Sequence, residues 1–218
     1  MSNVLRQPWM DDSTYEWYYL EEQARVNTLE RLHRGGNRAL IAVKAQHPLN
    51  ADGTPGKEYT LRLCKALKVK TGLEADGVTV DFVTFGGVHQ GHPMVTLAEA
   101  GRDYLVANGI GQEHIKSFNK IYSGNDEDRI AAEEFSNGDY SQLHVVCSAG
   151  QWERARLFYI FMGWQPFMHA VTFLEERPNH SMICELWGSW GVPAFANGPE
   201  SIKLATDEIV RKHLSEAQ

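Results

Sequence analysis

Apolar and polar positions follow two different periods along this chain, and the changes of period predict alternating helices and strands. Stretches with a broad apolar side at helical spacing predict helices, and short apolar runs rich in β-branched residues predict buried strands. The predicted helices cover residues 12–33, 59–69, 97–108, 126–135, 152–162 and 202–214. The predicted strands cover residues 39–43, 78–85, 115–118, 143–147, 167–174 and 182–186. Residues 86–93 are rich in glycine and are expected to form a loop.

This alternation predicts an α/β fold with a mostly parallel sheet, because strands separated by helices pair through right-handed crossovers. We expect a helical extension in residues 1–37 and an α/β core in residues 38–175. Residues 176–218 are expected to add a strand, a loop and a helix to the same domain. Ligands of such sheets bind beyond the carboxyl ends of the strands. Polar residues that follow the strands between Val80 and Gln165 are therefore the candidates for a ligand site.

Charge and cysteine content narrow the class of partner. The chain has 21 Lys and Arg against 28 Asp and Glu, a formal net charge of -7. An acidic chain without a basic stripe disfavours nucleic acid and anionic membrane surfaces as partners. The three cysteines show no metal-ligand spacing, the first residues show no secretion signal, and no apolar run approaches the length of a membrane helix. We expect a reduced, cytoplasmic protein that binds a small molecule.

Two glycine-containing segments follow predicted strands and suit an anionic ligand. Gly86 and Gly87 let the backbone turn tightly and approach a ligand closely. Ser148 and Gln151 lie between a strand and a helix, where the first helical amides favour an anion. Arg154 lies one turn further and could hold a phosphate or carboxylate through two hydrogen bonds. The alternatives are an ordinary turn, a helix cap at Ser148 and a solvated arginine.

Two further predicted helices begin with polar residues that have two interpretations. Glu99 is a candidate acid or base, but Thr96-x-x-Glu99 also fits a capping box, in which the two side chains satisfy free amides. Asn125 and Asp128 fit either a ligand site or a polar cap followed by an acid in the first turn. Helix N-termini gathered at one edge of the sheet would surround one pocket, which favours the site interpretation.

The remaining motifs do not predict a metal site or a serine nucleophile, and one tryptophan-containing loop has several possible roles. His89 and His92 lack carboxylate or further histidine partners, so no metal site is predicted. Ser148 lacks the first glycine of a GxSxG elbow and is not predicted to be a nucleophile. The loop with Trp187 and Trp190 could line a pocket, stack on a ring or form a contact in a homo-oligomer.

Five short motifs follow one another between roughly residues 38 and 170. They are Arg62 in the first crossover helix, Gly86-Gly87, Leu97-Ala98-Glu99-Ala100, Asn125-Asp126-Glu127-Asp128-Arg129, and Cys147-Ser148-Ala149-Gly150-Gln151-Trp152-Glu153-Arg154-Ala155. In order and spacing this series resembles the DUF218 family, also called the YdcF-like family. The resemblance implies a Rossmann-like three-layer sandwich whose site is built from these strand ends. It also implies a nucleotide-like ligand, such as S-adenosylmethionine.

The chain departs from that family at positions that matter for chemistry. Gln151 stands where the family has a histidine, and glutamine cannot shuttle a proton near neutral pH. Asp126 and Asp128 replace a threonine and a glutamate, and Arg129 replaces an asparagine. A role that the family assigns to the histidine is therefore lost or moved in this chain.

Together, the residues and the resemblance predict a cytosolic enzyme of small-molecule metabolism, in the transferase or hydrolase class. Glu99 or Asp128 would be the general acid or base. The predicted ligand-binding residues are Arg62, Gly86, Gly87, His89, Asn125, Ser148, Gln151 and Arg154. One alternative is a non-catalytic ligand-binding or regulatory protein, which the glutamine at position 151 favours. The other is a structural partner that uses the loop with Trp187 and Trp190.

Overall fold

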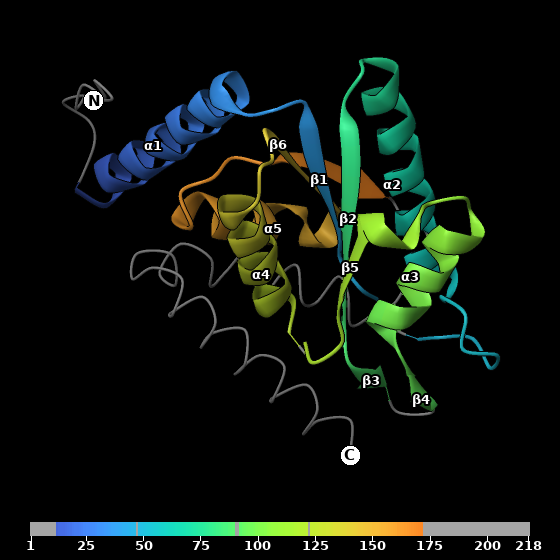
Figure 1. Ribbon diagram of the computed structural model, residues 1–218. Helices are drawn as coiled ribbons and strands as arrows, with labels where there is room; N and C mark the ends of the chain where they lie inside the picture. The colour runs from blue at the N-terminus through green and yellow to red at the C-terminus, as the bar shows by residue number, and fades with distance from the viewer. Residues whose placement is uncertain (1–11, 47, 90–91, 122, 172–218) are drawn as a thin grey trace, which may run out of the picture.

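Five parallel strands form the centre of the computed structural model, which describes residues 12–46, 48–89, 92–121 and 123–171 (Figure 1). The strands are β1 (Arg38–Val43), β2 (Thr79–Phe85), β5 (Ile115–Phe118), β6 (Gln142–Ser148) and β7 (Phe167–Val171). They lie in the order β5-β2-β1-β6-β7, and every pair in this sheet is parallel. Strands buried on both faces read as continuous apolar runs, which is how the sequence presents β1 and β6.

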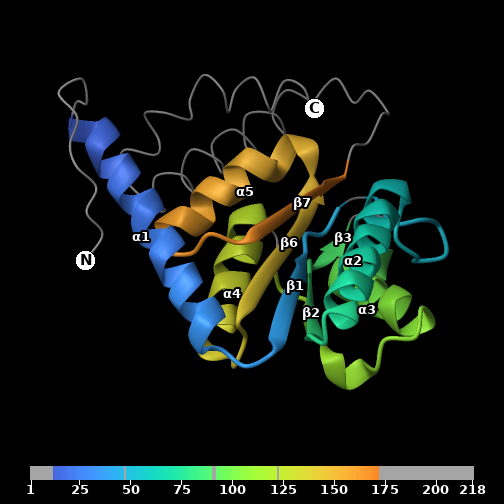
Figure 2. The same ribbon diagram turned by 90° about the horizontal axis from the view of Figure 1, so that it is seen from above.

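Helices cover both faces of the sheet and complete a Rossmann-like three-layer sandwich (Figure 2). Helices α2 (Lys57–Ala75) and α3 (Leu97–Ala107) bury Tyr59, Leu63 and Leu105 against one face. Helices α4 (Gly124–Asn137) and α5 (Ala149–Phe161) bury Phe135 and Tyr159 against the other. A short 3-10 turn, η1 (Gln112–His114), leads into β5.

Helix α1 (Asp12–Arg34) lies outside this sandwich and packs on α5 and β6. Arg31 donates hydrogen bonds to the carbonyls of Phe135 and Tyr140, at 2.9 and 2.7 Å, and so binds the C-terminal end of α4. The rings of Trp17 and Phe161 meet edge to face at 5.7 Å. Among the described residues, neither α1 nor any other helix has the length and apolar character needed to cross a membrane.

The strand order creates one special position, between β1 and β6. From β1 the chain moves outward through β2 to β5, and it then returns to the other side of β1 to form β6 and β7. The crossovers that leave these two neighbouring strands therefore diverge to opposite faces, and in sheets of this kind ligands bind beyond the carboxyl ends of such a strand pair. Residues just after Val43 and Val146, which are paired in register, lie at that position.

The structure corrects the predicted boundaries in three places. Residues 86–93 are not only a loop, because β3 (Val88–His89) and β4 (His92–Thr96) pair as an antiparallel hairpin. Helix α2 runs past Gly72 to Ala75, since one glycine on an open surface costs a helix only about 1 kcal/mol. Helix α5 begins at Ala149 rather than at residue 152, directly after β6. The predicted elements at 182–186 and 202–214 and the loop with Trp187 and Trp190 lie outside the described residues.

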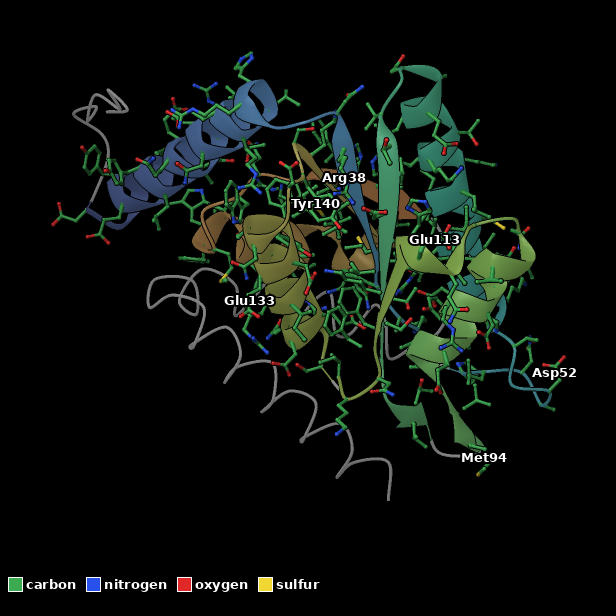
Figure 3. The ribbon with its side chains drawn as sticks, viewed as in Figure 1. Arg38, Asp52, Met94, Glu113, Glu133 and Tyr140 are labelled. Carbon is green, nitrogen blue, oxygen red and sulfur yellow. The ribbon has the colours of Figure 1, made fainter. Side chains whose placement is uncertain are left out.

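The two ends of the sheet differ in what surrounds them. At the end where the strands begin, Arg38 lies over the ring of Tyr140, 5.2 Å from its centre (Figure 3). At the opposite end, Asp52 and Met94 lie on the loop after β1 and on the hairpin after β2 (Figure 3). That loop and that hairpin approach each other closely, because a Cβ at Gly53 would lie 3.3 Å from Val95. The loop and the hairpin therefore lie together beside the carboxyl ends of the strands.

Candidate functional site

Charged side chains are buried together at the carboxyl ends of β1 and β6. Five ionisable residues and one serine there expose 7% or less of their surface: Lys44, Glu58, Arg62, Glu127, Asp128 and Ser148. They come from the ends of the two strands and from the first two turns of α2 and α4. Burying a charge costs several kcal/mol unless it is paired and hydrogen-bonded. We refer to these six residues as the switch-point cluster.

Arg62 is the centre of this cluster and is completely buried. Its Nη1 donates to the carbonyls of Lys44 and Ala45, at 3.0 and 2.8 Å. Its Nη2 lies 2.7 Å from Glu58 Oε1, and its Nε lies 3.1 Å from Ser148 Oγ. Gln46 Oε1 also accepts from Nη2. All N–H donors of this guanidinium therefore face protein acceptors. Because these acceptors lie at the ends of β1 and β6, Arg62 joins the two strand ends.

Ser148 is the N-cap residue of α5, but its hydroxyl does not cap the helix. The hydroxyl instead donates to Glu58 and accepts hydrogen bonds from Arg62. Its one donor and both lone pairs are thus engaged within the cluster. The first amides of α5, beside the ends of β1 and β6, are therefore not capped by the Ser148 side chain.

Lys44 follows β1 directly and is paired with two consecutive carboxylates of α4. Its Nζ lies 2.6 Å from Asp128 Oδ1, 3.4 Å from Glu127 Oε2 and 2.7 Å from the carbonyl oxygen of Gly124. Glu127 also accepts a hydrogen bond from the amide of Ala45 through Oε1, at 3.2 Å. These contacts join the end of β1 to the first turn of α4.

The start of α4 explains why these acids point inward. Ser123 is the N-cap and accepts from the amide of Asp126, which fixes the direction of the first turn. Asn125 is therefore not the cap, as one interpretation of the sequence had it, but a buried residue inside the helix. Asp128 lies one turn further on the same buried side.

Burial dominates the protonation of several groups at this site. Burial raises the pKa of Glu127, against the opposing charge of Lys44, and the neighbouring charge of Asp128 raises it further. Burial also raises the pKa of Tyr159, with the charge of Asp128 as the next cause, and the pKa of the Cys147 thiol to about 11. The two adjacent acids of α4 therefore lie in different environments, although they share one lysine.

Arg154 and Gln151 lie on the first turns of α5 and are half-buried. A Cβ at Gly124 would come within 2.6 Å of Arg154 Nη2, so the glycine makes room for the guanidinium beside the N-terminus of α4. The charge of Arg154 is also one of the influences on the Cys147 thiol. Arg154 is thus brought to the edge of the switch-point cluster.

The glycines after β2 use their backbone within the protein. Gly86 has a φ of +111°, and a Cβ there would lie 2.6 Å from the Cβ of Leu97, so only glycine fits. The amides of Gly86 and Gly87 donate to the carbonyls of Phe118 and Ile121, at 3.1 and 2.8 Å. Both glycines therefore connect the end of β2 to the segment after β5, which is the structural alternative that the sequence allowed.

Glu99 forms the capping box that its spacing permits. Its carboxylate accepts from the Thr96 amide and hydroxyl, at 2.9 and 2.7 Å, while its own amide donates to Thr96 Oγ1. The hydrogen bond from the Thr96 backbone is the main cause that lowers the pKa of Glu99. A catalytic role for Glu99 stays a prediction, and this carboxylate has a structural role at the start of α3.

The histidines lie apart from the switch-point cluster. His89 is in β3, on the hairpin after β2. His144 and His169 are neighbours on β6 and β7, with ring nitrogens 2.9 Å apart, as packing residues of the sheet. Burial lowers the pKa of His144 to about 3. Within the described part of the chain, no three His, Cys, Asp or Glu side chains are placed to share a metal ion.

A hollow of about 500 Å³ between the ends of α1 and α4 is a competing location. It is lined by Arg31, Arg34, Asp139 and Trp164, among others. It lies beside the C-terminal end of α4, and Arg31 is already engaged there with backbone carbonyls. The switch-point cluster, with its buried charges at the strand ends, is the stronger candidate.

Sequence reasoning found part of this cluster and missed the rest. Arg62, Asp128 and Ser148 were predicted, and the structure brings them together with Asn125 close by on α4. Lys44, Glu58 and Glu127 were not predicted. The Glu58–Arg62 pair, four residues apart on a predicted helix, and the lysine that ends an apolar run were the available signals.

Comparisons with known proteins add no assignment. No protein-family model, no curated protein and no solved structure matches this chain.

Proposed function

We propose that this protein is an enzyme that acts on a small polar molecule with an anionic part, bound where β1 and β6 end. The observation that carries the proposal is the switch-point cluster, in which Lys44, Arg62 and three carboxylates are buried at that position. A buried carboxyl group with a raised pKa and specific charged partners, as at Glu127, is characteristic of functional sites. Stability alone is a weak explanation, since well-packed apolar residues would often serve equally well.

The anionic part of the ligand belongs beside the N-terminus of α5, next to Arg154. The helix amides there are not capped by Ser148, and helix N-termini favour negative charge. Arg154 supplies a guanidinium at the same edge, beside Gly124. Asp128 and Glu127 supply carboxyl groups for acid–base chemistry or for binding ligand hydroxyls.

The motif series that resembles the DUF218 family supports the same proposal and favours a phosphorylated or nucleotide-like ligand, with S-adenosylmethionine as one candidate. The acidic net charge and the free thiols of Cys64 and Cys147 support a cytoplasmic location. A second candidate function is a non-catalytic ligand-binding or regulatory protein. The half-buried Gln151, in place of the family histidine, favours that alternative.

A thermal-shift panel tests the binding part of the proposal. The compounds are inorganic phosphate, AMP, ATP, S-adenosylmethionine and S-adenosylhomocysteine. A ligand at 100 times its Kd stabilises the folded state by about 2.7 kcal/mol. For a chain of 218 residues, this raises the melting temperature by about 5–10 °C.

The variant Arg154→Gln identifies the site. It should abolish the shift, whereas Arg102→Gln should leave it intact, because Arg102 pairs with Asp103 on the surface of α3. A panel without any shift would contradict the proposed ligand class. A shift that persists in Arg154→Gln would place the ligand elsewhere. For a compound that binds, product analysis in Asp128→Asn then separates the two candidates, since loss of turnover with retained binding indicates catalysis.

A further inference from the structure

The switch-point cluster contains an unequal number of buried charges. Lys44 and Arg62 are its buried cations, and Glu58, Glu127 and Asp128 are its buried carboxyl groups. If all five were ionised, these groups would carry one excess negative charge in a region with little water, since the next cation, Arg154, is only half-buried and its charge is not among those that act on Glu127. Such a charge is removed in proteins by protonation of one carboxyl group.

The contacts identify which carboxyl group is the least compensated. Glu58 Oε1 accepts a hydrogen bond from the Ser148 hydroxyl and lies 2.7 Å from Arg62 Nη2. Its charge is therefore compensated by an ion pair and by a second donor. Asp128 Oδ1 lies 2.6 Å from Lys44 Nζ. These are normal distances for charge-assisted hydrogen bonds.

Glu127 is held less tightly than either. Its Oε2 lies 3.4 Å from Lys44 Nζ, which is longer than the about 2.7–2.9 Å of a charge-assisted hydrogen bond. Its Oε1 has a neutral donor, the amide of Ala45, at 3.2 Å. Glu127 also has the more accessible side chain of the two acids that share Lys44, with 9% of its surface exposed against none for Asp128.

The charged and titratable groups around Glu127 act in both directions. Lys44 and Arg62 favour its ionised form, while burial and the charge of Asp128 oppose that form. Burial is the largest of these influences, and together they raise the pKa of Glu127. The buried Tyr59 and Tyr159 would be neighbours of any charge on Glu127, which would raise their pKa values too.

From these contacts we propose that Glu127 is the neutral, proton-bearing carboxyl group of the site, while Asp128 is its ionised neighbour on Lys44. This rests on the proposed function for its catalytic meaning, since the proton would serve an anionic ligand bound at the same strand ends. In that step the O–H bond of Glu127 breaks and the proton goes to an oxygen of the ligand. The ligand loses one negative charge as Glu127 gains one, so the total charge of site and ligand is unchanged, and the new carboxylate lies 3.4 Å from Lys44 Nζ. Two adjacent acids with different protonation are a common arrangement for acid–base catalysis.

The protonation state is measured by infrared difference spectroscopy of the ligand-free protein at pH 7. The spectrum of the wild type minus that of Glu127→Gln should contain one carbonyl band of a neutral carboxylic acid. The matched control is Glu133→Gln on the same helix, because Glu133 is half-exposed and paired with Arg129. Apart from the amide bands of the new glutamine, that difference spectrum should contain the bands of an ionised carboxylate and no band of a neutral acid. A carboxylate signal in the Glu127 difference spectrum would overturn the proposal.

Proton release on unfolding gives a second measurement that does not depend on the spectrum. An unfolded glutamate is ionised at pH 7, so wild type should release one more proton per molecule than Glu127→Gln when it unfolds. Equal release would overturn the proposal. Neither measurement uses a ligand, so an empty thermal-shift panel would contradict the proposed function without deciding the state of Glu127.

Discussion

Replacing Arg62 with methionine tests whether the buried guanidinium holds the two strand ends together. Methionine keeps most of the length and the apolar stem of arginine but has no donors. The variant removes the ion pair with Glu58 and the hydrogen bonds to Ser148 Oγ and to the carbonyls of Lys44 and Ala45. It leaves a carboxylate and two carbonyls buried without their donor.

The expected cost follows from the burial of both partners. Arg62 is 0% exposed and Glu58 is 5% exposed at the side chain, so solvent cannot replace the lost interaction. Breaking a buried pair of this kind costs about 3–5 kcal/mol. At about 2–4 °C per kcal/mol for a chain of this length, the melting temperature should fall by about 6–20 °C.

Urea and thermal unfolding of the wild type, Arg62→Met, Glu58→Gln and the double variant form the assay. The double variant should be less destabilised than the sum of the two single variants, because neither partner then remains as an unpaired charge. Arg102→Met is the control, since Arg102 forms an exposed pair and should change stability by no more than about 0.5 kcal/mol. If Arg62→Met costs no more than that control, the strand-joining role of Arg62 is wrong.

Three other outcomes follow from the described contacts. Gly101→Ala should destabilise by about 1–3 kcal/mol in urea unfolding, because the new Cβ would overlap the buried Tyr59 hydroxyl, and Tyr59→Phe should relieve part of that cost. Glu99→Ala should cost about 1 kcal/mol through loss of the capping box, and a larger loss at pH 3 than at pH 7 would contradict its lowered pKa. Because burial lowers the pKa of His144 to about 3, its contribution to stability is present above pH 6.5 and falls with acidification. The free energy of unfolding of the wild type should fall by about 2 kcal/mol between pH 7 and pH 5, and that of His144→Gln should not show this fall. The same pH dependence of the unfolding free energy in both proteins would refute this prediction.

The sheet and its helices could be predicted because each strand carries its own signal. The apolar run at residues 39–43 and the alternating run at 78–85 became β1 and β2, and the short run at 115–118 is the edge strand β5. The hairpin of β3 and β4 was missed because its residues combine glycine, proline and histidine, which indicate a loop. The residues on either side of the hairpin are joined by hydrogen bonds from the amides of Leu97 and Ala98 to the carbonyls of Gly87 and Gly86, which no local pattern contains.

The candidate site was harder to predict, since its residues become charged partners only through the fold. Asp128 and Arg62 were recognisable as polar residues near helix starts, but Lys44 had no visible partner along the chain. Its acidic neighbours Glu127 and Asp128 are more than 80 residues away, as the 84-residue separation of Lys44 and Asp128 illustrates. Conversely, the partner of Glu99 could be predicted from four consecutive residues, because Thr96-x-x-Glu99 fits a capping box. The structure contains that capping box.

The long separations within the switch-point cluster also determine when it can exist. Ser148 reaches Arg62 across 86 residues of chain, and Lys44 meets Asp128 only after α4 has docked. Contacts of this range form late, because the intervening chain must first be ordered. A growing chain that ends before β6 would contain Arg62 without Ser148 and so only part of the cluster. If the proposed function is correct, ligand affinity would therefore appear only after β6 has joined the sheet.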